Sequence, residues 1–185
     1  MGYQTDFDGE FTCTPALTLA QVAYLNRFSN SRRMKRNATI VATFPDPLRE
    51  AVGLPVGVEG EFYVDSEENA ETIVNYNEPP STQPGLWCQW VPNNEGHEIV
   101  WDGNEKFYDY VAWLEYIIDN FLSPWGIKLN GKVSWQGEEN DDRGTIYVKD
   151  NKVEALKDKV VQQKPSWMRK ATNAVIPIAD CSADK

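Results

Sequence analysis

The sequence predicts an α+β fold, in which an antiparallel sheet carries two main helices on one face. Three observations lead to this prediction. One segment near the N-terminus alternates with the period of a half-buried strand, two segments have apolar residues at helical spacing, and the elements follow the order strand, helix, strand, strand, helix, strand. This order is typical of a split βαβ (ferredoxin-like) arrangement, which extra C-terminal β-hairpins would extend.

The first strand and the first helix lie close to the N-terminus. Residues 5–13 alternate between apolar and polar side chains, which indicates a strand with one buried face. Thr18 is followed three residues later by Gln21, the spacing of a capping box. The apolar stripe that follows predicts a helix from about 18 to 29 or slightly beyond.

The segment from 37 to 84 is irregular. It contains six prolines, which prevent long regular elements because proline lacks the backbone N–H and fixes its own φ. A short helix at 47–52 and a strand at 61–64 are predicted within it. A long irregular segment inside a compact domain is often functional.

Regular structure is predicted again from residue 86 onward. Strands at 86–91 and 98–101 flank a loop rich in turn residues, which indicates a hairpin. Apolar residues that recur at steps of four and three predict the second helix at 104–122. Two more hairpins follow, one with an Asn-Gly turn at 130–131 and one with an Asp-Asn turn at 150–151.

Length and composition indicate one soluble domain at 1–156 and a partly ordered C-terminal extension at 157–185. A chain of 185 residues can bury one substantial core. It has no run of 18 apolar residues and no apolar segment at its N-terminus, so no membrane contact and a cytoplasmic location are expected. Its three cysteines form no CxxC pair, so neither a disulfide framework nor a metal site is indicated, and no cofactor is expected.

The charge of the chain is strongly acidic and unevenly spread. The formal net charge is −10. Residues 1–148 hold 10 Lys or Arg against 23 Asp or Glu, a net charge of −13, whereas residues 149–185 hold 8 against 5, a net charge of +3. Because nucleic-acid binding needs several cations on one surface, this distribution disfavours direct binding of DNA or RNA.

Five cations interrupt this acidic pattern near the end of the first predicted helix. One interpretation is structural: cations there stabilise the helix dipole and the free carbonyl groups, and pair with acidic side chains. The other is an anion site, because guanidinium groups bind phosphate through two parallel hydrogen bonds. We call this set the basic cluster; it consists of Arg27, Arg32, Arg33, Lys35 and Arg36.

Aromatic residues are concentrated in the second half of the chain. Six of the seven tryptophans lie between residues 87 and 135. Most of them should be core residues, because aromatic rings dominate burial energetics. Strand alternation places Trp87 opposite Trp90, so a partly exposed ring such as Trp87 or Trp125 is available to stack on a nucleobase or to anchor a partner protein. Together with the basic cluster, such a ring would form a nucleotide pocket.

Several long motifs resemble a family of small acidic proteins found in bacterial and phage genomes. The motifs are "RRMKR", "AVGLPVG", "QPGLWCQWVP", "WDGNEKFYDYVAWLEY" and "PWGIKLNGKVSWQGE", and the resemblance covers about residues 1–155. No activity is attached to that family, so the resemblance supplies no catalytic residue. It implies an accessory cytoplasmic role, and its phage association implies an anti-defence or host-takeover role.

The sequence therefore predicts a non-enzymatic cytoplasmic binding protein, and the resemblance implies that it is associated with phages or mobile elements. Its ligand would be a nucleotide-like anion or the surface of an acidic host partner, bound by the basic cluster with Trp87 and Trp125.

Two alternatives remain open. An enzyme would use Cys88 with His97, or loop carboxylates. A mimic of nucleic acid would block a host defence enzyme of the anti-restriction or anti-CRISPR type. The acidic face of that mimic would include Glu67, Glu68, Glu138, Glu139, Asp141 and Asp142.

Overall fold

The computed structural model describes residues 2–65 and 69–158 of the chain. Most of the predicted C-terminal extension, from 159 to 185, lies outside the described residues. Glu67 and Glu68 of the predicted acidic face also lie outside them. The fold below is that of the described part.

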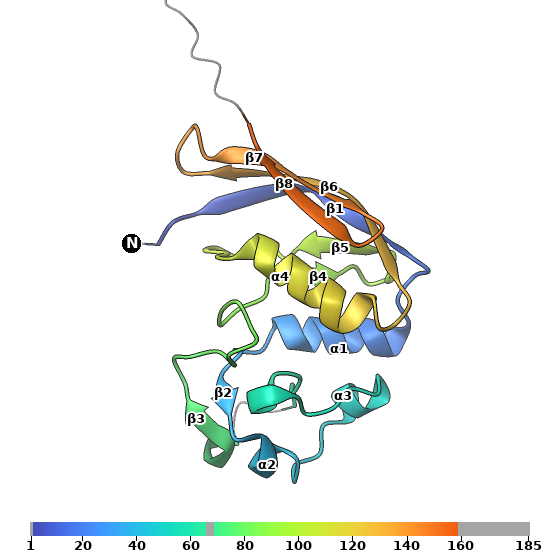
Figure 1. Cartoon of the computed structure of the whole chain (residues 1–185), viewed down its shortest axis with the longest axis vertical. Coiled ribbons are helices and arrows are strands. Elements are labelled where there is room, and N and C mark those ends of the chain that lie inside the picture. The colour runs from blue at the N-terminus through green and yellow to red at the C-terminus, as the bar shows by residue number, and fades with distance from the viewer. Residues whose placement is uncertain (1, 66–68, 159–185) are drawn as a thin grey trace, which may run out of the picture.

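A six-stranded antiparallel sheet forms the top layer of the molecule in Figure 1. Its strand order is β4-β5-β1-β6-β7-β8, so the first strand of the chain lies in the middle of the sheet. The predicted α+β class is confirmed, and the C-terminal strands β7 and β8 do extend the sheet. The strands are β1 (Thr5–Thr14), β4 (Trp90–Pro92), β5 (Glu98–Trp101), β6 (Lys128–Gly137), β7 (Arg143–Lys149) and β8 (Lys152–Lys157).

Two main helices lie side by side under one face of the sheet (Figure 1). Helix α1 (Leu19–Ser29) begins at Thr18 with the predicted capping box, in which Thr18 and Gln21 each accept the other's backbone N–H. Helix α4 (Tyr110–Ile117) continues through a π-helical turn to Leu122. It begins later than the predicted 104 because Asp109 has a left-handed φ of 53°.

The irregular middle segment forms a separate layer on the far side of the helices from the sheet (Figure 1). The predicted short helix at 47–52 is confirmed, whereas the predicted strand at 61–64 is wrong: these residues are buried without a strand partner. The segment contains helices α2 (Ala38–Val41) and α3 (Pro47–Ala51), the 3-10 turns Val58–Gly60 and Ala70–Thr72, and a small sheet of β2 (Lys35–Arg36) and β3 (Ile73–Asn75).

One of the two predicted hairpin turns is correct and the other is wrong. Asp150 and Asn151 have φ values of 48° and 68°, and they join β7 to β8 as predicted. The Asn-Gly dipeptide at 130–131 forms no turn, because β6 runs through it without a break. Gly131 instead lies opposite Phe11 of β1, where its φ is 141°.

Aromatic rings fill the core between the sheet and the helices. Trp90 contacts Phe7, Phe11 and Phe107 edge to face, and its indole N–H donates to the carbonyl oxygen of Tyr110 at 2.7 Å. The prediction that most tryptophans are core residues therefore holds for this ring and for the fully buried Trp113. The exposed Trp87 belongs to the site described next.

Candidate functional site

The basic cluster is largely built into the fold. Arg33 is only 3% exposed, and its guanidinium group donates to the carbonyl oxygens of Glu61 (2.7 Å) and Tyr63 (3.0 Å). The same group lies 4.2 Å from the centre of the Phe28 ring. Burial lowers the pKa of Arg33, because removing the cation from water disfavours its charged form.

Other members of the basic cluster also contact the middle segment. Arg27 donates to the carbonyl oxygens of Val64 at 2.9 Å and Asp65 at 2.7 Å. Lys35 forms an ion pair with Glu59 at 2.9 Å, and the buried Arg36 donates to the hydroxyl group of Thr72. These contacts support the structural interpretation of the cluster.

The partners of Arg27 and Arg33 nevertheless differ from the expected ones. The cluster was expected to stabilise the end of helix α1 or to pair with acidic side chains, but Arg27 and Arg33 bind backbone carbonyls between residues 61 and 65. That stretch is buried without a strand partner, so its carbonyl groups need donors from elsewhere. The guanidinium groups supply them.

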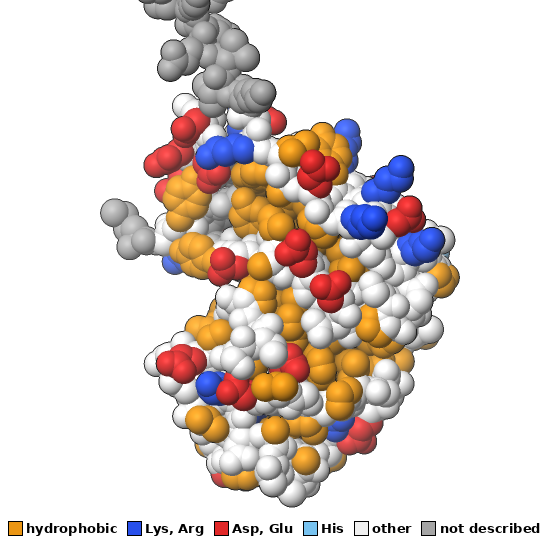
Figure 2. All heavy atoms as spheres, in the orientation of Figure 1, with side chains coloured by type: hydrophobic (Ala, Val, Ile, Leu, Met, Phe, Trp, Pro, Cys, Tyr) orange, Lys and Arg blue, Asp and Glu red, His pale blue; other side chains and the backbone are white. Residues whose placement is uncertain are grey.

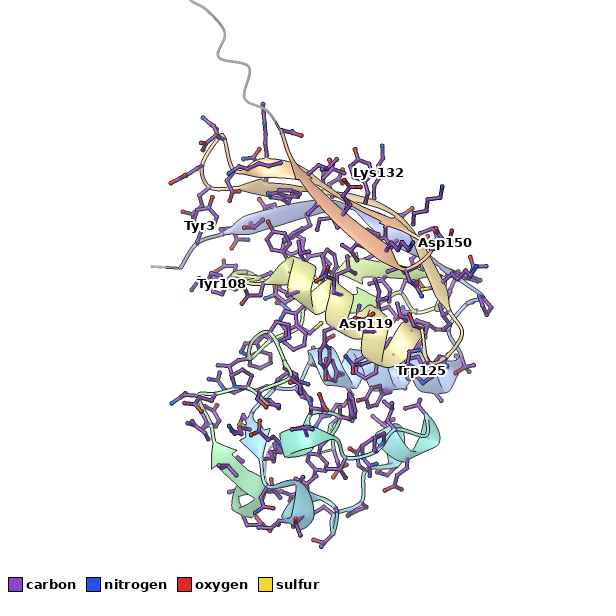
Figure 3. All side chains as sticks on the ribbon, in the orientation of Figure 1. Tyr3, Tyr108, Asp119, Trp125, Lys132 and Asp150 are labelled. Atoms are coloured by element: carbon purple, nitrogen blue, oxygen red, sulfur yellow. The ribbon has the colours of Figure 1, made fainter. Side chains whose placement is uncertain are left out.

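A groove lies beside Trp87. Its volume is about 660 Å³, and it is lined by residues from the segments 77–89 and 105–113. Figure 2 shows that the molecule is hollowed between the sheet-and-helix part and the middle segment, on the side where Figure 3 labels Tyr108. We call this hollow the Trp87 groove.

Exposed aromatic rings lie along the Trp87 groove. Trp87 itself is 43% exposed and Tyr108 is 53% exposed. A second hollow of about 310 Å³ lies against Trp87 and Gln89 as well, and it extends to Asn30 at the end of helix α1. Trp87 therefore borders both hollows, and its ring is available for stacking on a ligand.

The basic cluster holds one wall of the Trp87 groove in place. Arg32 donates to the carbonyl oxygen of Tyr76 at 3.0 Å and to Asn77 Oδ1 at 3.4 Å, and Asn77 lines the groove. The backbone N–H of Arg33 donates to the carbonyl oxygen of Leu86 at 2.9 Å. No member of the cluster lines either hollow beside Trp87, so its contribution there is to position the wall.

The opposite wall contains a buried donor without a partner. Trp113 is fully buried and lines the groove, but its Nε1–H has no hydrogen-bond acceptor among the described residues. An unsatisfied buried donor costs roughly 1–3 kcal/mol, so such groups call for an explanation in native structures. The donor lies beneath the surface of the groove, out of contact with solvent.

The backbone of this wall is also unusual. Lys106 and Asp109 both have left-handed φ values, 62° and 53°, although neither is glycine. Such conformations are uncommon for residues with a side chain and are enriched at binding sites. Both residues line the Trp87 groove, so these unusual backbone conformations lie in the same wall as Trp113.

The second predicted stacking residue lies elsewhere. Trp125 stacks on Phe121 at a centroid distance of 5.7 Å and contacts Tyr24 edge to face. Figure 3 places Tyr108 and Trp125 near opposite ends of helix α4. The structure therefore does not bring Trp125 and Trp87 to one site.

The residues suggested for catalysis or metal binding are not arranged for either task in the described part. Cys88 is fully buried, and burial raises the pKa of its thiol to about 12, so little thiolate is present at neutral pH. His97 is exposed in the loop between β4 and β5. No three His, Cys, Asp or Glu side chains of residues 2–65 and 69–158 are grouped as a metal site requires.

Part of the predicted acidic face is used within the fold. Asp142 accepts the Tyr3 hydroxyl hydrogen at 2.7 Å, and Glu138 accepts the backbone N–H of Gln4 at 2.8 Å. The Tyr3 hydroxyl lowers the pKa of Asp142 because it stabilises the carboxylate. These contacts attach the start of the chain to the β6–β7 loop.

Comparison with family models, curated proteins and solved structures finds no match to this chain. Within the described residues, no helix has the length and apolar character needed to cross a membrane. The assignment of a candidate site to the Trp87 groove therefore depends on the geometry of this structure alone.

Sequence reasoning identified Trp87 but missed the rest of the groove. Asp109 and Trp113 lie in the segment that was expected to be helix, and Gly85 lies just before an expected strand; none of them was predicted to be a site residue. The signal that could have drawn attention to the region is the "STQPG" stretch at 81–85, whose turn residues predict that the chain changes direction just before Trp87.

Proposed function

We propose that this chain is a non-enzymatic binding protein and that its ligand occupies the Trp87 groove. The observation that carries the proposal is the hollow of about 660 Å³ along which the exposed rings of Trp87 and Tyr108 lie. A groove with apolar walls and a few convergent polar groups is the usual form of a small-molecule site.

A nucleotide-like ligand fits the groove better than an extended polyanion. Stacking on an exposed aromatic ring contributes roughly 1–3 kcal/mol per base. Lys106 offers one cation for a phosphate group, while Glu105 and Asp109 in the same lining repel a chain of phosphates. The ligand that we propose therefore carries one planar group and little negative charge.

We also infer a split βαβ arrangement for four of the strands. In the order β6-β1-β5-β4, the first strand of the chain lies between β6 and β5, and each neighbouring pair is antiparallel. Helix α1 lies in the connection from β1 to β4, and helix α4 lies in the connection from β5 to β6. These connections support the arrangement.

The cellular setting is part of the same proposal. We place the protein in the cytoplasm of a bacterial host, in an accessory role linked to phages or mobile elements. The support is the resemblance of its motifs to the family of small acidic proteins, together with two free, buried cysteines, Cys13 and Cys88, which fit a reducing compartment.

Replacing Trp87 with alanine tests the proposed site. A panel of nucleotides and nucleosides is screened by thermal shift, and the affinity of each stabilising compound is measured by calorimetry. We expect Trp87→Ala to weaken binding about 10- to 100-fold, because the stacking surface is lost. Chromatography should recover the ligand unchanged.

Tyr147→Ala is the matched control, because Tyr147 is also 43% exposed but lies on β7, away from the groove. It should leave the affinity unchanged. If no compound stabilises the protein, or if Trp87→Ala binds as tightly as the parent, the groove is not the ligand site. Turnover of the ligand would contradict the non-enzymatic part of the proposal.

A further inference from the structure

Trp87 borders a second hollow besides the Trp87 groove. This second hollow has a volume of about 310 Å³ and is lined by the end of helix α1, by Trp87 and Gln89, and by Asp102, Asn104 and Glu105. A hollow of this size accommodates one long amino-acid side chain. Its lining differs in charge from that of the Trp87 groove, so the two hollows call for different ligands.

The lining of the second hollow is anionic. Among the described residues it contains two carboxylates, those of Asp102 and Glu105, and no Lys or Arg. Ser29 and Asn30 add the C-terminal end of helix α1, where the macrodipole places partial negative charge. The ring of Trp87 is 43% exposed, and the face of an indole ring attracts cations. These features together favour a cationic ligand.

Gln89 holds the acidic wall of the second hollow in place. This residue is only 7% exposed. Its carbonyl oxygen accepts the backbone N–H of Asp102 at 3.0 Å, and its side-chain amide donates to the carbonyl oxygen of Glu105 at 3.0 Å. Trp101 Nε1–H donates to Gln89 Oε1 at 3.0 Å, which fixes the orientation of the amide. The wall is therefore formed before any ligand arrives, which lowers the cost of binding.

The two carboxylates of this wall retain their negative charge within the fold. Within residues 2–65 and 69–158, no ion pair involves Asp102 or Glu105. Asp102 accepts two hydrogen bonds from Asn104, one on each carboxylate oxygen and both at 2.8 Å. An ionised carboxylate has about four acceptor positions, so capacity remains for further donors.

We propose that the second hollow binds an arginine side chain of a partner protein, with its guanidinium group against Trp87 and facing the carboxylates of Asp102 and Glu105. A guanidinium group is planar and carries five N–H donors, so it stacks on an indole ring and also donates to carboxylates. A lysine ammonium group has the charge but no planar surface. This site goes beyond the proposed function, because it is separate from the Trp87 groove and takes a different ligand.

The source of the guanidinium group is a protein and not the free amino acid. Free arginine carries its own carboxylate, which the two acidic side chains and the end of helix α1 would repel. An arginine within a peptide chain has no such group. In addition, residues 1–148 carry a net charge of −13, which attracts a basic protein over a long range. Arginine and tryptophan are also the residues that contribute most often to protein–protein binding energy.

An NMR titration of the full chain with short peptides tests this inference. The probe is acetyl-Gly-Arg-Gly-amide, and its affinity is compared with those of the lysine and citrulline versions and of free arginine. Citrulline has nearly the shape of arginine but no charge. We expect the lysine peptide and free arginine to bind about 5-fold more weakly than the arginine peptide, and the citrulline peptide at least about 10-fold more weakly.

Substitutions in the lining locate the bound peptide. Asp102→Asn keeps an acceptor for Asn104 but removes the charge, so it should weaken the arginine peptide about 5-fold. Trp87→Ala removes the stacking surface and should weaken it about 10-fold. Asp141→Asn, at an exposed carboxylate of the β6–β7 loop, is the matched control and should leave the affinity unchanged.

The outcomes separate this inference from the proposed function. Asp102 does not line the Trp87 groove, so Asp102→Asn should not weaken a nucleotide bound there. Failure of the arginine peptide to bind, equal affinities for the arginine and citrulline peptides, or an unchanged affinity in a folded Asp102→Asn variant would overturn this inference alone. If the arginine peptide binds in a manner that depends on Asp102 while no nucleotide binds, the inference stands and the proposed function is overturned.

Discussion

Arg33→Ala should lower the free energy of unfolding by about 3 kcal/mol. The substitution removes the donors to two carbonyl groups, those of Glu61 and Tyr63, at a place that is buried. An acceptor left unsatisfied in the interior costs roughly 1–3 kcal/mol. The void above the Phe28 ring adds to the loss. Urea denaturation followed by tryptophan fluorescence measures the change.

Arg143→Ala is the matched control for this prediction. Its guanidinium group is half exposed and pairs with Asp158 at 3.7 Å, so its loss should cost at most about 1 kcal/mol. If Arg33→Ala were as stable as Arg143→Ala, Arg33 would not be a structural residue. The interpretation of the basic cluster as an anion site would then regain its support.

Gly131→Ala should lower the free energy of unfolding by roughly 3 kcal/mol as well. At a φ of 141°, an L-residue is strained by about 1–2 kcal/mol. The added Cβ would also lie 2.6 Å from the carbonyl oxygen of Glu10 on β1, so the two strands must separate locally. Because β1 is the central strand of the sheet, we expect a large change in the urea midpoint.

The control for Gly131 is a glycine that also has a positive φ but no close neighbour. Gly103 has a φ of 81°, and nothing lies within 4 Å of its added Cβ. Gly103→Ala should therefore cost only about 1 kcal/mol, the backbone strain alone. Equal losses in the two variants would show that the contact between β1 and β6 is not close enough to exclude a side chain.

Local patterns predicted the elements that depend on short-range interactions. The capping box at Thr18 fixes where helix α1 begins, and the Asp-Asn dipeptide at 150–151 adopts the left-handed conformations of its turn. In both cases the residues that decide the conformation are neighbours in sequence. The alternating pattern of β1 is equally local, and its predicted bounds differ from the observed ones by one residue.

Predictions that depend on distant partners failed. The Asn-Gly dipeptide at 130–131 has the local preference for a turn, but β1 pairs with β6 on both sides of it and keeps the strand continuous. The predicted strand at 61–64 has apolar residues, yet the donors that satisfy its backbone come from arginine side chains. Tertiary contacts decided both outcomes.

In the candidate site, too, local features could be predicted from the sequence and contacts between distant residues could not. The exposure of Trp87 was anticipated, and Trp87 and Trp90 do differ, at 43% and 1% exposed. The strand alternation from which it was predicted is wrong, because β4 begins only at Trp90. The basic cluster was recognised as unusual, but the sequence does not show that its partners are carbonyl groups more than 25 residues away. The Trp87 groove combines the segments 77–89 and 105–113, which no local pattern relates.

Fluorine NMR of protein labelled with 5-fluorotryptophan tests the central claim, that the ligand binds in the Trp87 groove, most directly. Each tryptophan gives its own resonance, and Trp87→Phe and Trp113→Phe assign the two that matter. At saturation with the tightest-binding nucleotide, we predict shifts of the Trp87 and Trp113 signals, while those of Trp125 and Trp135 stay in place. Shifts confined to Trp125 or Trp135, with Trp87 unchanged, would contradict the account.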